Sequence, residues 1–166
     1  MNSERTVGDL AGIFENEPAR QAMDQSQVVY RVSAHLPVSD GTEAGLFYGA
    51  SYLEPGRVGD EYFMTKGHFH QKRHAAEYYW GIRGDGVLLL MDEQRRCWGE
   101  RVTPGSLHYI PGNVAHRLVN VGDETLAVGA CWPSDAGHDY ATIAELGFSS
   151  RIKCVDGVPE LAPVGA

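Results

Sequence analysis

Residues 77–91, EYYWGIRGDGVLLLM, contain two short apolar runs on either side of the turn Gly84-Asp85-Gly86. Each run is rich in tyrosine, valine or leucine and is too short for a helix of ordinary length, so each is typical of a strand. Glycine on both sides of an aspartate marks a chain reversal. The stretch therefore predicts two consecutive strands with no helix between them.

The same pattern extends in both directions along the chain. Strands are expected at 27–36, 45–53, 61–68, 77–82, 87–91, 95–102, 106–110, 116–121 and 125–132. Short strands that recur about every ten residues, without helices between them, predict a sandwich or small barrel and not a parallel α/β sheet. One short helix is expected at 15–25, with Asn16 as its N-cap and Pro18 in its first turn.

The composition describes an ordinary globular chain of 166 residues with a formal net charge of −8. Nucleic acids and anionic membranes require a basic surface, so neither is expected as a partner. The three cysteines have no short spacing, which favours a reducing compartment without disulfides. The sequence shows neither a secretory signal nor an apolar run of membrane-spanning length, so we expect a cytoplasmic protein.

The chain divides into three expected parts. Residues 1–25 form an N-terminal extension that contains the short helix, and residues 26–155 form the barrel. Residues 156–166 are rich in proline, glycine and alanine, so we expect a frayed tail there.

Four residues have the types and spacing of metal ligands. His68 and His70 are two apart, which on a strand puts both imidazoles on one face and Phe69 on the other. Glu77 begins the next strand, and a β-hairpin is expected to bring it beside the pair; His116 follows a Pro-Gly turn. Taken alone, a His-x-His pair is more often two solvated or core-edge histidines. With Glu77 and His116 added, the set predicts a site for Fe²⁺, Mn²⁺, Ni²⁺, Zn²⁺ or Cu²⁺.

Two groups of residues resemble the motifs of a known superfamily, the cupins. The first group is His68, His70, Glu77 and Gly84, and the second is Gly105, Pro111, His116 and Asn120. The six residues between His70 and Glu77 are more than the usual gap. The strings EYFMTKGHFH (61–70) and DAGHDYATIAE (135–145) are more specific, because they are similar to those of the cupin-type phosphoglucose isomerases, best known from archaea. The resemblance runs from about residue 28 to residue 148 and implies an all-β cupin double-stranded β-helix, which is a jelly-roll barrel.

The resemblance also implies an activity. The family interconverts glucose 6-phosphate and fructose 6-phosphate, a step of glycolysis and gluconeogenesis, and its members are typically homodimers. One divalent metal per chain is expected, Fe²⁺ first, then Mn²⁺, Ni²⁺ or Zn²⁺. The implied metal ligands are His68, His70, Glu77 and His116. The implied catalytic residues are Glu77, His138 and Tyr79, and the implied substrate contacts are Tyr30, Ser51, Thr65, Gly67 and Tyr140.

The chemistry of isomerisation suggests roles for Glu77, Tyr79 and His138, although the residues alone leave these roles partly open. Moving a hydrogen between adjacent carbons needs a base, an electrophile and a dry pocket. Glu77 is the expected base if it loosens its metal bond when substrate binds; otherwise a direct hydride shift operates. Tyr79 shares strand parity with Glu77, although a barrel-core tyrosine would show the same pattern. His138 either assists ring opening near neutral pH or closes the loop at 135–140.

The expected phosphate side contains a conflict. Strand parity places Lys66 with His68 and His70, whereas the resemblance nominates Thr65 and the backbone N–H of Gly67. A bulge at Lys66-Gly67 would reconcile the two. A divalent cation beside one carboxylate leaves about +1 in the pocket, so the net charge does not argue against an anionic sugar.

Three departures from the family pattern are present, one of which is His74 and Ala75 in place of an Asp-Arg pair before Glu77. The other two keep alternatives open. Trp132 replaces a tyrosine, and residues 111–114, PGNV, replace an aromatic-bearing stretch; both are expected at the pocket wall. The alternatives are a related cupin isomerase or epimerase that acts on another phosphosugar, and a non-catalytic sugar-binding cupin. The complete ligand set counts against the second alternative. An Fe(II) dioxygenase would share the ligands but would not account for Thr65-Lys66-Gly67.

Overall fold

The computed structural model describes residues 2–165, most of which lie in antiparallel strands. The elements in chain order are β1 (Asn2–Thr6), the 3-10 helix η1 (Gly8–Leu10), α1 (Glu17–Gln21), β2 (Val28–His35), β3 (Leu46–Leu53), β4 (Arg57–Val58), β5 (Glu61–Tyr62), β6 (Glu77–Arg83), β7 (Gly86–Asp92), β8 (Cys97–Val102), β9 (Leu107–Ile110), β10 (Val114–Asn120), β11 (Leu126–Pro133), α2 (Tyr140–Leu146), β12 (Ser150–Val155) and β13 (Val158–Pro163).

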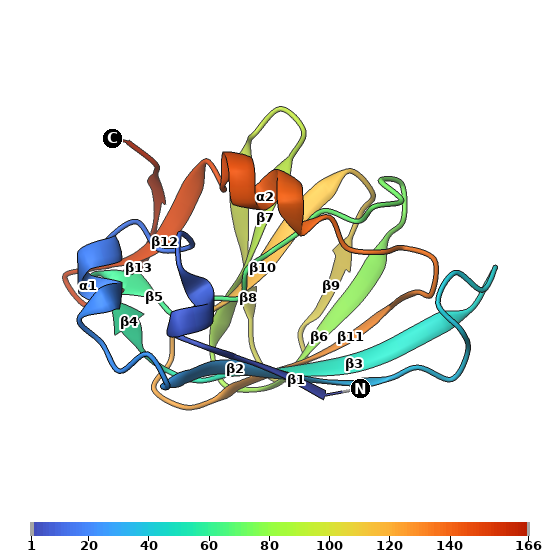
Figure 1. Cartoon of the computed structure of the whole chain (residues 1–166), viewed down its shortest axis with the longest axis horizontal. Helices are drawn as coiled ribbons and strands as arrows, with labels where there is room; N and C mark the ends of the chain where they lie inside the picture. Colours follow the sequence, from blue (N-terminus) through green and yellow to red (C-terminus); the bar gives the residue numbers. More distant parts are fainter. Residues whose placement is uncertain (1, 166) are drawn as a thin grey trace.

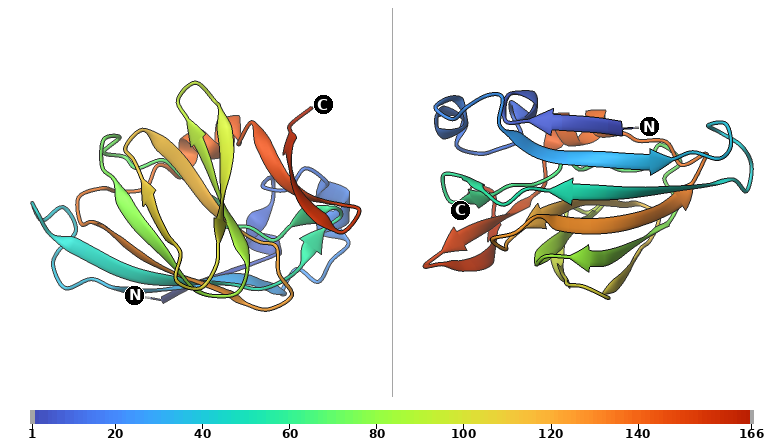
Figure 2. Two further views of the ribbon diagram at one scale, coloured as in Figure 1. Left: turned by 180° about the vertical axis from the view of Figure 1, so that it is seen from behind. Right: turned by 90° about the horizontal axis from the view of Figure 1, so that it is seen from below.

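The strands form three sheets. A six-stranded sheet, in the order β1-β2-β3-β11-β6-β9, curves beneath a three-stranded sheet, β10-β7-β8 (Figure 1). The third sheet, β13-β12-β5-β4, lies at one end together with α1, while α2 lies in front of the upper part of β7 (Figure 1). Seen from below, the six-stranded sheet forms one continuous twisted surface (Figure 2). The core between the sheets is filled by fully buried side chains such as Leu88, Leu90, Leu53 and Phe63, so the barrel is closed by apolar packing at one end.

Eight of the nine predicted strands are present, with bounds within two residues of those expected. The exception is 61–68, where β5 ends at Tyr62. Beyond it the chain follows β10 through single bridges, Met64 to Val119 and His68 to His116. Thr65 Oγ1 accepts a hydrogen bond from the N–H of Leu118 at 3.1 Å, and Gly67 has a φ of 74°. Both features interrupt a regular ladder of backbone hydrogen bonds between this segment and β10. A side chain at Gly67 would also meet the Phe148 ring and Arg117.

The short helix is shorter than expected but begins as predicted. The Asn16 side chain accepts the N–H of Ala19 at 3.0 Å, and Pro18 lies in the first turn. The helix α2 was not predicted; Asp139 caps it by accepting the N–H of Thr142 at 3.1 Å. None of the helices formed by residues 2–165 is long and apolar enough to cross a membrane.

Both chain ends take part in sheets. β1 pairs with β2 at the edge of the six-stranded sheet, and Val7, Leu10 and Phe14 after it are buried in the core. The tail at 156–166, which we expected to fray, contains β13, which pairs with β12 from Val158 to Pro163. The extension at 1–25 thus completes one edge and one end of the barrel.

Candidate metal centre and pocket

Four ligand-type side chains converge inside the barrel. The ligand atoms of His68, His70, Glu77 and His116, here called the His–Glu cluster, all lie within 4.8 Å of one another. Glu77 Oε1 is 2.5 Å from His116 Nε2 and 3.2 Å from His70 Nε2. His70, Glu77 and His116 are buried, and His68 is partly buried and faces the pocket described below. Residues from three separate stretches of sequence thus meet at one point, as the sequence predicted.

The backbone brings the cluster together by a route that the sequence did not indicate. The N–H and C=O of His68 pair with those of His116 at 3.2 and 3.1 Å. The expected β-hairpin between the His-x-His stretch and Glu77 is wrong, because β6 pairs with β9 and β11. Residues 71–76 instead form a loop that leads from segment 63–70, beside β10, to the start of β6 in the six-stranded sheet.

The loop also orients one ligand. His70 Nδ1 lies 2.9 Å from the carbonyl oxygen of Ala75, to which it donates. A histidine that donates from Nδ1 presents the lone pair of Nε2 to the cluster, which is the tautomer a metal requires. The longer gap before Glu77 therefore supplies the partner that fixes His70.

The residues fit a divalent cation. Among residues 2–165, His68 Nε2, His70 Nε2, Glu77 Oε1 and His116 Nε2 are buried atoms without a hydrogen-bond partner, because their short mutual approaches lack hydrogen-bond geometry. Each such orphaned atom costs about 1–3 kcal/mol unless something satisfies it. Imidazole nitrogen and carboxylate oxygen are donors that borderline divalent metals accept.

The charge states of two members, Glu77 and His68, suit the same role. Burial raises the pKa of Glu77, but attraction to His116 and the other histidines outweighs burial and leaves that pKa well below its usual range. Burial, reinforced by His116, lowers the pKa of His68. An ionised carboxylate and a neutral imidazole are the forms in which these side chains bind metals.

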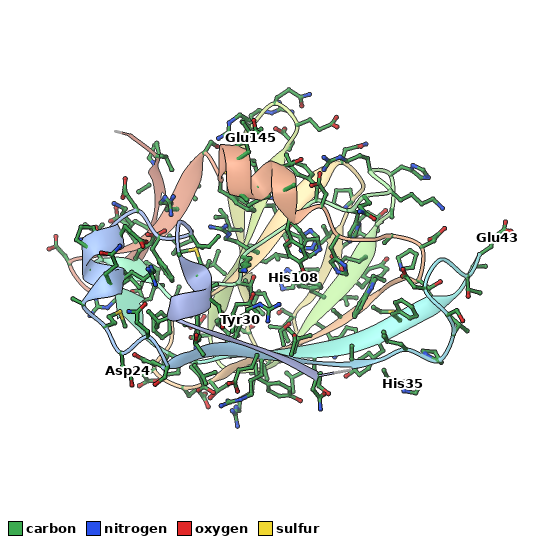
Figure 3. All side chains as sticks on the ribbon, viewed as in Figure 1. Asp24, Tyr30, His35, Glu43, His108 and Glu145 are labelled. Carbon is green, nitrogen blue, oxygen red and sulfur yellow. The ribbon has the colours of Figure 1, made fainter. Side chains whose placement is uncertain are left out.

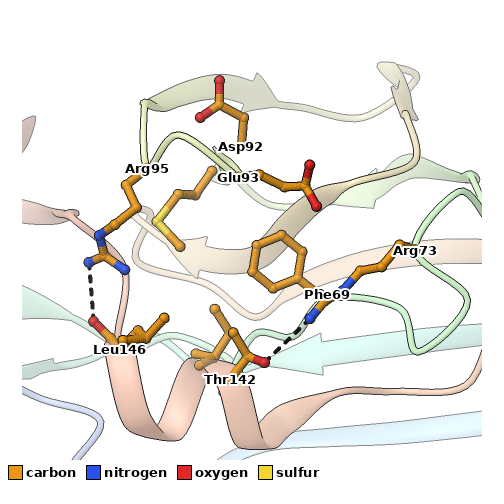
Figure 4. A pocket seen from close by; sticks show the side chains of 9 residues that line it. Phe69, Arg73, Asp92, Glu93, Arg95, Thr142 and Leu146 are labelled. Carbon is orange, nitrogen blue, oxygen red and sulfur yellow. Dashed lines mark hydrogen bonds between the residues drawn. The ribbon is translucent and has the colours of Figure 1, made fainter.

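Phe69 points away from the cluster, as the strand parity predicted. Its ring is buried, and the Arg73 guanidinium lies 4.3 Å from the ring centroid. The ring lines a separate small cavity of about 190 Å³ between α2 and the β7–β8 turn (Figure 4). None of the four cluster residues lines that cavity.

A larger pocket of about 700 Å³ opens beside the His–Glu cluster, a size in the range of small-molecule sites. It contains every substrate-contact and catalytic residue nominated from the sequence, whereas His70 and His116 lie behind its wall. The nominated residues that line it are Tyr30, Ser51, Thr65, Gly67, Glu77, Tyr79, His138 and Tyr140. Tyr30 is carried by β2 in the six-stranded sheet (Figure 3).

Aromatic and imidazole rings form the part of the pocket nearest the cluster. Tyr79 lies edge-on to His116, with ring centroids 5.6 Å apart, and burial raises its pKa well above the usual range. The rings of His138 and Tyr140 stack at 5.7 Å, and His138 is 4.5 Å from His68. Although solvent reaches His138, desolvation by these rings lowers its pKa, which favours the neutral imidazole at pH 7.

The opposite part of the pocket is built on an irregular backbone. Thr65, Lys66 and Gly67 all line it, although alternating strand residues would point to opposite sides. The left-handed φ of Gly67 breaks the alternation and resolves the conflict between Lys66 and its neighbours. Burial raises the pKa of Tyr30 to about 12 in spite of a hydrogen bond with the Lys66 backbone and the nearby charges of Arg5 and Arg117, which act in the opposite direction.

The two departures expected at the pocket wall lie in different parts of the structure, and only one of them lines the pocket. Trp132 lines the pocket, 6.4 Å from the ring of His138. Gly112 and Asn113 do not line it, so our expectation for them is wrong. The Asn113 N–H donates to the carbonyl of Arg73 at 2.5 Å, and a side chain on Gly112 would strike the backbone of His74. This turn packs on the ligand-bearing loop.

Sequence reasoning missed the contribution of the first strand. Ser3 and Arg5 of β1 line the pocket beside Tyr30 and Val32. The polar stretch Asn2–Thr6 has no apolar alternation, so only its pairing with β2 reveals its place.

Comparisons with known proteins agree on one family. The family model described as glucose-6-phosphate isomerase matches residues 4–157. The glucose-6-phosphate isomerase of Thermococcus litoralis is 41% identical over 152 residues, which cover 90% of this chain and 79% of the relative. That of Pyrococcus furiosus is 42% identical over 152 residues, with coverage of 90% and 79%. A putative glucose-6-phosphate isomerase 2 of Rhizobium meliloti is 36% identical over 167 residues, with coverage of 96% and 82%.

Solved structures share the fold at low sequence identity. An oxalate oxidase with a bound substrate analogue superposes with a TM-score of 0.54 at 15% identity, over 69% of this chain and 56% of that one. Oxalate decarboxylase of Bacillus subtilis gives 0.50 at 19% identity, over 66% and 26%. The chain thus spans about half or less of these neighbours, and the likeness confirms the predicted cupin barrel alone.

The cluster predicts one divalent cation per chain. Isothermal titration of chelator-treated protein with Mn²⁺ should show a single site. His70→Ala should weaken that site by more than the roughly 10- to 100-fold that loss of an outer-sphere partner costs. His74→Ala is the matched control, because His74 is exposed on the same loop, and it should bind Mn²⁺ as the wild type does. Equal affinity in both variants would contradict the assignment.

Proposed function

The chain belongs to the glucose-6-phosphate isomerase family, and from that premise we propose that it interconverts glucose 6-phosphate and fructose 6-phosphate in the large pocket. The observation that carries the proposal is that one pocket is lined both by His68 and Glu77 of the His–Glu cluster and by Thr65–Gly67. The stretch from Thr65 to His68 extends over at most about 10 Å. This span is comparable to an open-chain hexose phosphate with its carbonyl end at the cluster.

In the proposed mechanism, the two oxygens of the Glu77 carboxylate have different roles. When bound, a divalent cation supplies an electrophile that polarises the two substrate oxygens. Only Oε1 of Glu77 is both buried and orphaned, and Oε1 is the atom beside the histidines. We therefore assign proton transfer between C1 and C2 to Oε2, while Oε1 stays with the ligand set.

The neighbouring side chains serve orientation and ring opening. Tyr79, whose raised pKa keeps it a neutral O–H donor, is placed to hydrogen-bond a substrate oxygen beside Glu77. Neutral His138 beside His68 is placed to accept the proton of the anomeric hydroxyl and to return it to the ring oxygen as the bond between C1 and that oxygen breaks. Tyr140 stacks on His138 and covers it, and Ser51, Thr65, Gly67 and Tyr30 line the phosphate side.

One observation favours a second substrate. Trp132 lines the pocket near His138 at the position where the family has a smaller tyrosine. A bulkier wall narrows the room for the sugar, so another phosphosugar remains the alternative substrate for the same chemistry. We take Fe²⁺ as the first metal to test, followed by Mn²⁺, Ni²⁺ and Zn²⁺, and we place the reaction in the cytoplasm, in glycolysis and gluconeogenesis.

The outer face of the six-stranded sheet supports a homodimer. Aromatic and aliphatic side chains of β3, β6 and β9 are exposed there, among them Leu107 at 66% and Tyr109 at 54%. Tyr48 stacks on Trp80 at 5.4 Å, and Tyr78 packs on Tyr109 at 5.3 Å. A contiguous apolar face of this kind marks an interaction surface, and we propose a second copy of the chain as its partner.

The metal-dependent activity is tested by removal and restoration. Fructose 6-phosphate conversion should be lost when the metal is stripped and should return with at least one of Fe²⁺, Mn²⁺, Ni²⁺ or Zn²⁺. Metal content measured alongside the assay decides whether stripping succeeded. Full activity in metal-free protein would exclude the role of the cluster, and turnover of another phosphosugar alone would move the assignment to the alternative substrate.

Glu77→Gln should retain the fold and much of the metal but lose about 10²- to 10⁴-fold in kcat, the usual contribution of a general base. Glu100→Gln is the matched control, because Glu100 also contacts a histidine, His108 at 2.7 Å, outside the pocket. Wild-type turnover in deuterated water should incorporate solvent hydrogen into the product. Turnover without incorporation would favour a direct hydride shift instead.

The dimer is tested by light scattering after gel filtration. Wild-type protein should have the mass of two chains, and Leu107→Lys with Tyr109→Lys should shift it to one, since charges at an apolar interface are costly to bury. Leu161→Lys on β13, where Leu161 is 43% exposed, should leave the mass unchanged. A monomeric wild type, or a double variant that still dimerises, would reject this face.

A further inference from the structure

The N-terminal strand contributes a cation to the pocket. In β1, Ser3 and Arg5 pair in register with Val32 and Tyr30 of β2, and all four side chains line the pocket. Glu4 points to the opposite face, where it accepts from Arg31 at 2.8 Å. The alternation of β1 therefore aims Arg5 inward.

Arg5 has no counter-ion of its own in the described part of the chain. Within residues 2–165 its guanidinium makes no ion pair, and its one side-chain hydrogen bond is from Nη1 to the Glu4 carbonyl at 2.8 Å. Arg31 on the next strand contrasts with it, since Arg31 pairs with both Glu4 and Glu54. Most N–H donors of the partly buried Arg5 guanidinium therefore have no hydrogen-bond partner among the described residues.

The groups around Arg5 belong to the expected phosphate side. The charge of Arg5 acts on Tyr30 and Tyr140, and it also acts, together with Lys66, on exposed Asp9. Asp9 is occupied by the backbone N–H of Thr6 at 2.8 Å and by its hydroxyl at 3.0 Å. Among the described residues that line the pocket, the arginine and lysine are Arg5 and Lys66, and the acidic residues are Asp40 and Glu77.

We propose that Arg5 is a specificity-determining residue that binds the substrate's phosphate group from the first strand of the chain. The inference rests on the proposed function and deepens it. A guanidinium with free donors matches the oxygens of a phosphate better than an ammonium does, and such charge-assisted bonds are the strong ones. Selection for a phosphosugar over a free sugar then depends on β1, the edge strand of the six-stranded sheet.

The experiment compares a phosphorylated inhibitor with its neutral counterpart. Competition by sorbitol 6-phosphate and by sorbitol is measured against fructose 6-phosphate in metal-loaded wild type, Arg5→Ala, Arg5→Lys and Arg31→Ala. Arg5→Ala should raise the KM and the inhibition constant of sorbitol 6-phosphate in parallel, by about tenfold or more for a lost charge-assisted bond. The inhibition constant of sorbitol and kcat should change little, and Arg5→Lys should recover part of the loss.

Arg31→Ala is the matched control, because Arg31 lies on the neighbouring strand and faces the other way; its constants should equal those of the wild type. Unchanged sorbitol 6-phosphate inhibition in Arg5→Ala would overturn the inference, as would an equal loss for sorbitol. Thermal unfolding of each variant separates a folding defect from a binding defect. If the wild type isomerises neither sugar phosphate, the proposed function fails, and calorimetric titration with sorbitol 6-phosphate still decides the role of Arg5.

Discussion

Four buried polar atoms with no partner in the protein constrain the rest of the molecule. The Nε2 atoms of His68, His70 and His116 and Oε1 of Glu77 meet at a point where no side chain of residues 2–165 satisfies them by a hydrogen bond. A divalent cation at this point would offset the cost of burying these atoms, and its binding would then stabilise the folded state. The irregular path of residues 63–70 along β10 and the loop before β6 bring the four atoms together.

The sequence predicted the elements whose pattern is local and missed those defined by distant partners. β6 and β7 alternate or stay apolar over their own length and are joined by Gly84-Asp85-Gly86, so both were found. β1 and β13 are polar or proline-containing edge strands, and only their partners β2 and β12 define them. The regular strand expected at 61–68 failed because Gly67 adopts a left-handed conformation that alternation cannot reveal.

The candidate site shows the same division. The ligand set was predicted because residue type and spacing carry it, and the structure brings its four members together. The hairpin expected at Glu77 was wrong, since the destination of the loop at 71–76 is decided by sheet pairing. Gly112 and Trp132 looked equivalent as departures from the family, yet only Trp132 reaches the pocket. Sequence position does not show which side of a turn faces a cavity.

The net charge of −8 and an anionic substrate are compatible because the charge is unevenly distributed. Arg117, next to His116, is a further cation behind the proposed phosphate side, where burial, together with the nearby charge of Arg151, lowers its pKa to about 9. It donates to the carbonyl of Lys66 at 2.5 Å and lies 4.2 Å over the Phe148 ring. By holding that carbonyl from behind, Arg117 fixes the peptide between Lys66 and Gly67, so the N–H of Gly67 lies on the opposite side of that peptide. In the proposed function, a phosphate group would then meet a preset backbone donor at Gly67 with Arg5 and Lys66 lining the same pocket, so the local charge there is less negative than the net charge of the chain suggests.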